Sequence, residues 1–95
     1  MANKPLDRAA QIADVFKSLG HPIRVGIILL LKKSGELSVN SICEALKTEQ
    51  SLTSHHLNHL KKSGVIACKR QGKQIFYYLI SKEALGLLGG AQKMI

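Results

Sequence analysis

Acidic residues are scarce in this sequence. Only 6 Asp and Glu stand against 14 Lys and Arg, a formal net charge of +8. An excess of positive charge of this size favours a polyanionic partner through the long-range field of the whole molecule. A basic protein that is merely soluble would show the same balance, so charge alone leaves that alternative open.

Long apolar runs and cysteine frameworks are also missing. The most apolar run, VGIILLL, has seven residues, whereas a membrane-spanning helix needs about 20. The first residues, MANKPLDRAAQIA, lack the apolar core of a signal peptide, so we expect a cytoplasmic protein with no membrane partner. Its two cysteines, Cys43 and Cys68, show no CxxC spacing. A structural disulfide is therefore not expected in this reducing compartment.

Motifs that would indicate an enzyme are absent. The sequence has no paired-carboxylate motif, no Gly-rich phosphate loop and no nucleophile elbow. We therefore predict neither catalysis nor a cofactor.

The 95 residues predict one domain of short elements without an internal linker. Apolar residues at steps of three and four predict a helix over residues 5–19. Pro22 suits the first turn of a second helix, which is apolar nearly all round and should be the buried centre. Ser38 caps a short third helix, and a break at residues 47–49 leads into a fourth.

The residue composition changes after the fourth helix. Residues 65–70 and 74–80 are rich in β-branched and aromatic residues, and Gly72 between them suits the positive φ of a tight turn. These segments predict a β-hairpin. Ser81 then caps a last helix over about residues 82–88.

The order of these elements is that of a winged helix-turn-helix domain, mainly α with a β-hairpin (α-α-α-α-β-β-α). The helix-turn-helix spans residues 38–62 and the wing residues 64–80 of a single domain, 1–95. No acidic residue lies between Lys61 and Lys73, where five basic residues gather. Cations at the end of a recognition helix and on the wing would meet DNA phosphates, although a solvated charged face is the simpler alternative.

Three of the four histidines fall within SLTSHHLNHL, residues 51–60. His55 and His59 share a helical face and could in principle grip a cation. A zinc site needs a third ligand, and no Cys, Asp or Glu lies in that helix. We therefore predict no metal site, expect His56 to be packed inside, and assign His55 to the DNA groove, with His59 as a further candidate.

Four blocks of the sequence resemble a known family. GHPIRVGIILLL, ELSVNSICEAL, SLTSHHLNHLKKSGVI and KRQGKQIFYYLI are similar to successive blocks of the ArsR/SmtB family of bacterial winged-helix repressors. The resemblance implies a homodimer that binds double-stranded operator DNA. It also implies release of that DNA when a metal, a metalloid or a thiol-reactive signal arrives.

The sequence departs from the family at two of its metal sites. Metal-sensing members carry a Cys-Val-Cys-type motif at the third helix, where this chain has Ser38-Val39-Asn40. A second family site uses Asp, His and Glu on the last helix, where this chain offers only Glu83. Neither site can be built from these residues, and the effector is left unassigned.

We therefore predict a sequence-specific, homodimeric repressor that pairs through residues 5–19 and 81–95. The residues expected at base edges are Ser51, Leu52, Ser54 and His55, with Gln50 and Asn58 beside them. Those expected at phosphates are Lys61, Lys69, Arg70 and Lys73. The alternative is a thiol-responsive repressor that uses Cys43, Cys68 or both, although each also fits a small core residue.

Overall fold

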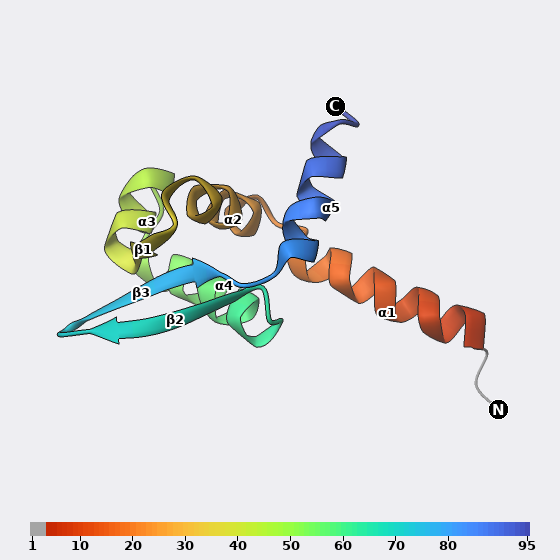
Figure 1. Cartoon of the computed structure of the whole chain (residues 1–95), viewed down its shortest axis with the longest axis horizontal. Coiled ribbons are helices and arrows are strands. Elements are labelled where there is room, and N and C mark those ends of the chain that lie inside the picture. The colour runs from red at the N-terminus through yellow and green to blue at the C-terminus, as the bar shows by residue number, and fades with distance from the viewer. Residues whose placement is uncertain (1–3) are drawn as a thin grey trace.

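The computed structural model describes residues 4–95, which form five helices and one three-stranded antiparallel sheet (Figure 1). In chain order the elements are α1 (Lys4–Leu19), α2 (Pro22–Ser34), β1 (Glu36–Ser38), α3 (Val39–Leu46), α4 (Gln50–Lys62), β2 (Ile66–Gln71), β3 (Gln74–Leu79) and α5 (Lys82–Gln92). The predicted winged helix-turn-helix fold is confirmed. None of the helices within residues 4–95 is long and apolar enough to cross a membrane.

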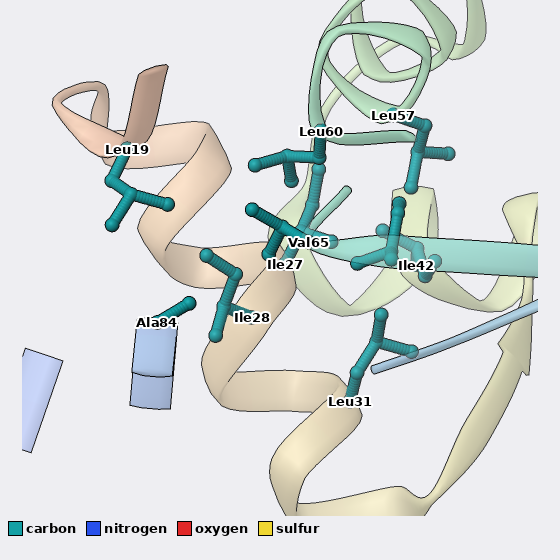
Figure 2. Packing of buried hydrophobic residues seen from close by; sticks show 10 residues of the cluster. Leu19, Ile27, Ile28, Leu31, Ile42, Leu57, Leu60, Val65 and Ala84 are labelled. Atoms are coloured by element: carbon teal, nitrogen blue, oxygen red, sulfur yellow. The ribbon is translucent and has the colours of Figure 1, made fainter. Parts of the chain in front are cut away.

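The hydrophobic core is built around α2, as its all-round apolar pattern predicted. Ile27, Ile28 and Leu31 are fully or almost fully buried, in one cluster with Leu57 and Leu60 of α4. Ile27 lies nearest Leu60, and Ile28 lies nearest Ala84 of α5 (Figure 2). Burying a side chain of this size contributes about 1.5–3 kcal/mol relative to exposure. The packing of α4 against α2 therefore fixes which side of α4 remains for a partner.

The sheet has a strand that the sequence pattern did not predict. β1 pairs with β3, and the strand order is β1-β3-β2. A strand of three residues carries too little alternation to be recognised in sequence. Its existence depends on β3 as a hydrogen-bonding partner that comes almost forty residues later. The predicted hairpin is thus two strands of a larger sheet, and Gly72 supplies its turn with φ 64°.

The caps predicted at Ser38 and Ser81 are confirmed, since each side chain accepts a hydrogen bond from a backbone amide in the first turn of α3 and α5. His21 caps α2 in the same way, and one helix boundary needs correction. The prediction ended α5 near Leu88, but the helix continues through Gly89 and Gly90 to Gln92. Glycine disfavours helix by about 1 kcal/mol relative to alanine, and packing of the leucines of α5 against the core helps to offset this cost.

Candidate nucleic-acid interface

The helix α4 divides into an inner and an outer side. Thr53, Leu57 and Leu60 are completely buried, as their spacing predicted. The outer side carries uncharged hydrogen-bonding residues and one leucine. Gln50, Ser51, Leu52, His55 and Asn58 are exposed, and Ser54 is half-buried. The structure therefore brings all six residues predicted for base edges onto one helix, with five of them open to solvent.

A short polar turn holds α4 against α3. Lys47 ends α3 in the left-handed conformation, with φ 55°. The hydroxyl of Thr53 donates to the carbonyl of Glu49 at 2.9 Å and lies 2.6 Å from the hydroxyl of Thr48. Because Thr53 uses its only proton on Glu49, Thr48 is the donor in the second bond. These bonds tie the turn to the first turn of α4 and so fix the direction in which α4 points.

His56 has a structural role, as its inward position predicted. The ring is 4% exposed, and its Nδ1 accepts a hydrogen bond from Nε of Arg24 at 3.1 Å. The ring of His21 packs on it at a centroid distance of 4.2 Å. Burial, and then the charges of His21 and Arg24, lower the pKa of His56 below its usual value. The ring is therefore held neutral, with Nδ1 as acceptor and the proton on Nε2.

The other two histidines of α4 differ from each other. His55 is exposed, whereas His59 is half-buried and its Nε2 has no hydrogen-bond partner among residues 4–95. Burial, followed by the charge of Arg24, lowers the pKa of His59. Within residues 4–95, no three His, Cys, Asp or Glu side chains gather in a group that could hold a metal ion. The unpartnered atom of His59 was not foreseen from the sequence, because it depends on packing against α1 and α2.

The basic residues lie at the end of α4 and along the hairpin. Lys61, Lys62, Arg70 and Lys73 are exposed. Lys69 is exposed too, but its Nζ lies 2.8 Å from the carboxylate of Glu36 in β1. The prediction treated Lys69 as a free cation because it did not include β1. The ion pair leaves Lys69 with less net charge to offer a phosphate than Arg70 or Lys73.

The two cysteines are free thiols and both are half-buried. Cys43 lies on α3, and Cys68 of β2 is paired in register with Tyr77 of β3. Burial, and secondarily Cys68, raise the pKa of the Tyr77 hydroxyl. Half-burial agrees with the reading of both cysteines as small packing residues, and the thiol-responsive alternative stays a prediction.

Comparison with known proteins identifies the family. The sequence model described as "Bacterial regulatory protein, arsR family" matches residues 21–67. An uncharacterised HTH-type transcriptional regulator of Methanocaldococcus jannaschii is 37% identical over 75 residues, which are 79% of this chain and 84% of the relative. The arsenical resistance operon repressor of Escherichia coli is 43% identical over 65 residues, which are 68% of this chain and 56% of the relative.

A solved structure of a transcriptional repressor has a similar fold to this chain. The transcriptional repressor BigR from Xylella fastidiosa is similar with a TM-score of 0.84 and 29% identity, covering 100% of this chain and 97% of that one. The chain therefore belongs to the ArsR family of bacterial regulatory proteins, and it is a DNA-binding transcriptional regulator rather than an enzyme.

Proposed function

We propose that this protein is a homodimeric repressor that binds a specific operator through α4 and the β2–β3 wing. One observation carries the proposal. From Gln50 to Lys73 the chain has no acidic residue, and its exposed side chains pass from hydrogen-bonding groups on α4 to cations at the helix end and wing. This order matches the sequence of contacts that a winged domain makes from groove to backbone.

The outer side of α4 has the chemistry of base reading. Amide and hydroxyl side chains such as Asn58 and Ser54 both donate and accept, and a histidine ring such as His55 offers a donor and an acceptor. These groups suit the donor and acceptor pattern that base pairs present in the major groove. Leu52 adds an apolar surface suited to a thymine methyl group.

The cations suit phosphates and carry no sequence information of their own. Lys61 lies in the last turn of α4, while Arg70 and Lys73 flank the hairpin tip. In antiparallel strands, directly paired residues share a face. The register therefore places Arg70 with Ile75 and places Lys69 on the opposite face with Phe76. Arg70, Lys73 and Lys61 should carry most of the phosphate binding, with a smaller share for Lys69.

A second copy of the chain would cover α1, which extends away from the rest of the domain (Figure 1). The radius of gyration is 14.7 Å, against about 12 Å for a compact domain of this length. Ile12, Val15 and Phe16 of α1 are each about half exposed, at 51%, 48% and 55%. An isologous two-fold contact would bury this surface. Within the second segment predicted to pair, residues 81–95, Ala84 is instead buried in the core of its own domain.

The effector is not expected to be a metal bound at the family's inherited sites. Ser38 and Asn40 stand where thiolates would be needed, and Glu83 is the only acid of α5. Titration with zinc, cadmium and arsenite should give no tight stoichiometric binding coupled to DNA release. Observation of such coupling would contradict this part of the proposal.

The decisive experiment compares two variants on operator and scrambled duplexes at several salt concentrations. His55→Ala should weaken operator binding by about 1–3 kcal/mol and leave scrambled DNA almost unchanged. Lys73→Ala should weaken both alike and reduce the salt slope by about one unit. Lys33→Ala, which removes an exposed lysine at the end of α2, serves as the charge-matched control. If His55→Ala leaves the ratio of the two affinities unchanged, α4 does not read bases through His55.

A further inference from the structure

An open cavity of about 500 Å³, lined mostly by polar residues, lies where α1, α2 and α4 meet. Pockets that bind small molecules usually measure about 300–1,000 Å³. The residues around this cavity that bear on its chemistry are Asp14, Lys17, His21, Arg24, His59 and Ser63. DNA reading as proposed above uses none of these side chains.

Arg24 brings an unneutralised positive charge to this cavity. Its Nε donates to His56, and its Nη1 donates to the carbonyls of Ser18 at 3.1 Å and Lys17 at 3.3 Å. Its Nη2 makes no hydrogen bond to any residue within 4–95, and no acidic residue of that range forms an ion pair with it. A half-buried guanidinium with free donors is a preorganised partner for an oxyanion.

His59 supplies a second unsatisfied group on the α4 side of the cavity. Its buried Nε2 has no partner among residues 4–95, and an unpaired buried polar atom is unfavourable. Because burial and Arg24 hold the pKa of His59 low, the ring is neutral at pH 7 and carries one N–H. The ring is among the residues that line the cavity, so a small rotation of the His59 side chain would offer this N–H to an oxygen atom there.

We propose that this cavity, between α1, α2 and α4, is a binding site for a small phosphate- or carboxylate-bearing anion held by Arg24, Lys17 and His59. Arg24 and Lys17 outweigh Asp14, the one carboxylate of the lining, so the net charge of the site is positive. The amino-terminal end of α2, capped by His21, adds a partial positive charge on the same side.

The place of the cavity gives the anion a regulatory role, and this consequence rests on the proposed function. α1 is the helix assigned to dimerisation and α4 is the helix assigned to DNA. An anion that bridges Lys17 of α1 and His59 of α4 favours one relative position of these two helices. If DNA binding needs a different position, or the same one, the anion weakens or strengthens DNA binding accordingly. The anion is either a free small molecule or a phosphate of the bound DNA backbone.

The test titrates DNA-free protein with inorganic phosphate, exchanged for chloride at constant ionic strength. NMR signals of the His59 ring and of Arg24 Nε–H should shift saturably. Lys17→Ala should weaken phosphate binding by about two- to threefold, and Asp14→Asn should strengthen it by a similar factor. Lys33→Ala, at the far end of α2, should leave it unchanged. Both Lys17 and Asp14 are exposed, so neither variant depends on refolding of the core, unlike Arg24→Gln.

The outcomes separate the alternatives. The anion site would be overturned if the NMR shift were absent or did not saturate. It would also be overturned if Lys17→Ala and Lys33→Ala had equal effects on phosphate binding, or if Lys17→Ala strengthened that binding and Asp14→Asn weakened it. DNA binding in phosphate-free buffer then identifies the source. If Lys17→Ala weakens DNA binding and phosphate competes with DNA, the site holds a backbone phosphate; if Lys17→Ala leaves DNA binding unchanged without phosphate, it holds a free anion. Because the phosphate titration contains no DNA, its failure is distinct from failure of the proposed function.

Discussion

Arg24 of α2 links three helices through three hydrogen bonds. The guanidinium donates to the ring of His56 on α4 and to the carbonyls of Lys17 and Ser18 in the last turn of α1. The hydrogen bond from Arg24 requires a lone pair on Nδ1 of His56. Protonation of His56 would replace that lone pair with an N–H that faces the N–H of Arg24, and the hydrogen bond would be lost. The tilt of α4 therefore depends on a histidine that must stay neutral.

This requirement predicts a loss of stability in mild acid. The native pKa of His56 lies below the value of 6.5 expected in the unfolded chain, so the unfolded state binds the proton first. The free energy of unfolding is then fully present above about pH 6.5 and falls as the pH drops below it. His59 shifts in the same direction and adds to the effect. Urea unfolding at a series of pH values from about 7.5 to 5.5 measures this slope.

The matched variant is His56→Gln, whose side-chain oxygen can still accept from Arg24 but does not titrate. It should have a shallower slope between those pH values than the natural chain. Equal slopes for the two proteins would mean that His56 does not control the acid response.

At the scale of elements, the α3–α4 turn contains a strained residue. Lys47 adopts φ 55°, a conformation that costs an ordinary residue about 1 kcal/mol and glycine almost nothing. We expect Lys47→Gly to raise the free energy of unfolding by about 0.5–1 kcal/mol. Lys47→Asn removes the same charge at a residue type that tolerates this conformation, so it should give a smaller gain. A loss of stability in both variants would show that the lysine side chain itself supports the turn.

The strand β1 brings an acid next to the wing. Glu36 pairs with Lys69, and both side chains are about two-fifths exposed, so the pair itself contributes little stability. Its effect on DNA should be larger, because the carboxylate offsets a cation of the phosphate-binding surface. Glu36→Gln should tighten specific and scrambled DNA alike, by about two- to fivefold. In the Lys69→Ala variant, adding Glu36→Gln should not tighten DNA binding. If it does, Glu36 affects DNA binding by a route other than its ion pair with Lys69.

At the scale of the whole molecule, the shape of one chain predicts that two copies form a dimer. Phe16 is 55% exposed on an α1 that extends from the domain. Phe16→Lys should convert a dimer at tens of micromolar into a monomer, because it places a charge in an apolar interface. Gln11→Lys adds the same charge to α1 without removing apolar surface and should leave the dimer largely intact. Sedimentation velocity distinguishes the two, and a monomeric natural chain would contradict the interface itself.

Much of this protein follows from sequence because its signals are local. Caps at Ser38 and Ser81, the turn at Gly72 and the apolar α2 each depend on a few neighbouring residues, and the structure has them where they were predicted. The inner and outer sides of α4 follow from helical period alone. The order of these elements was enough to predict a winged helix-turn-helix.

What only the tertiary structure decided depends on residues far apart in the chain. β1 exists because β3 supplies its hydrogen bonds, and this pairing brings Glu36 to Lys69. The neutral His56, and the Nε2 of His59 that has no partner within residues 4–95, arise where α4 packs against α2 and α1. Such contacts leave no periodic trace in sequence, because hydrogen bonding and desolvation act between side chains that folding alone brings together.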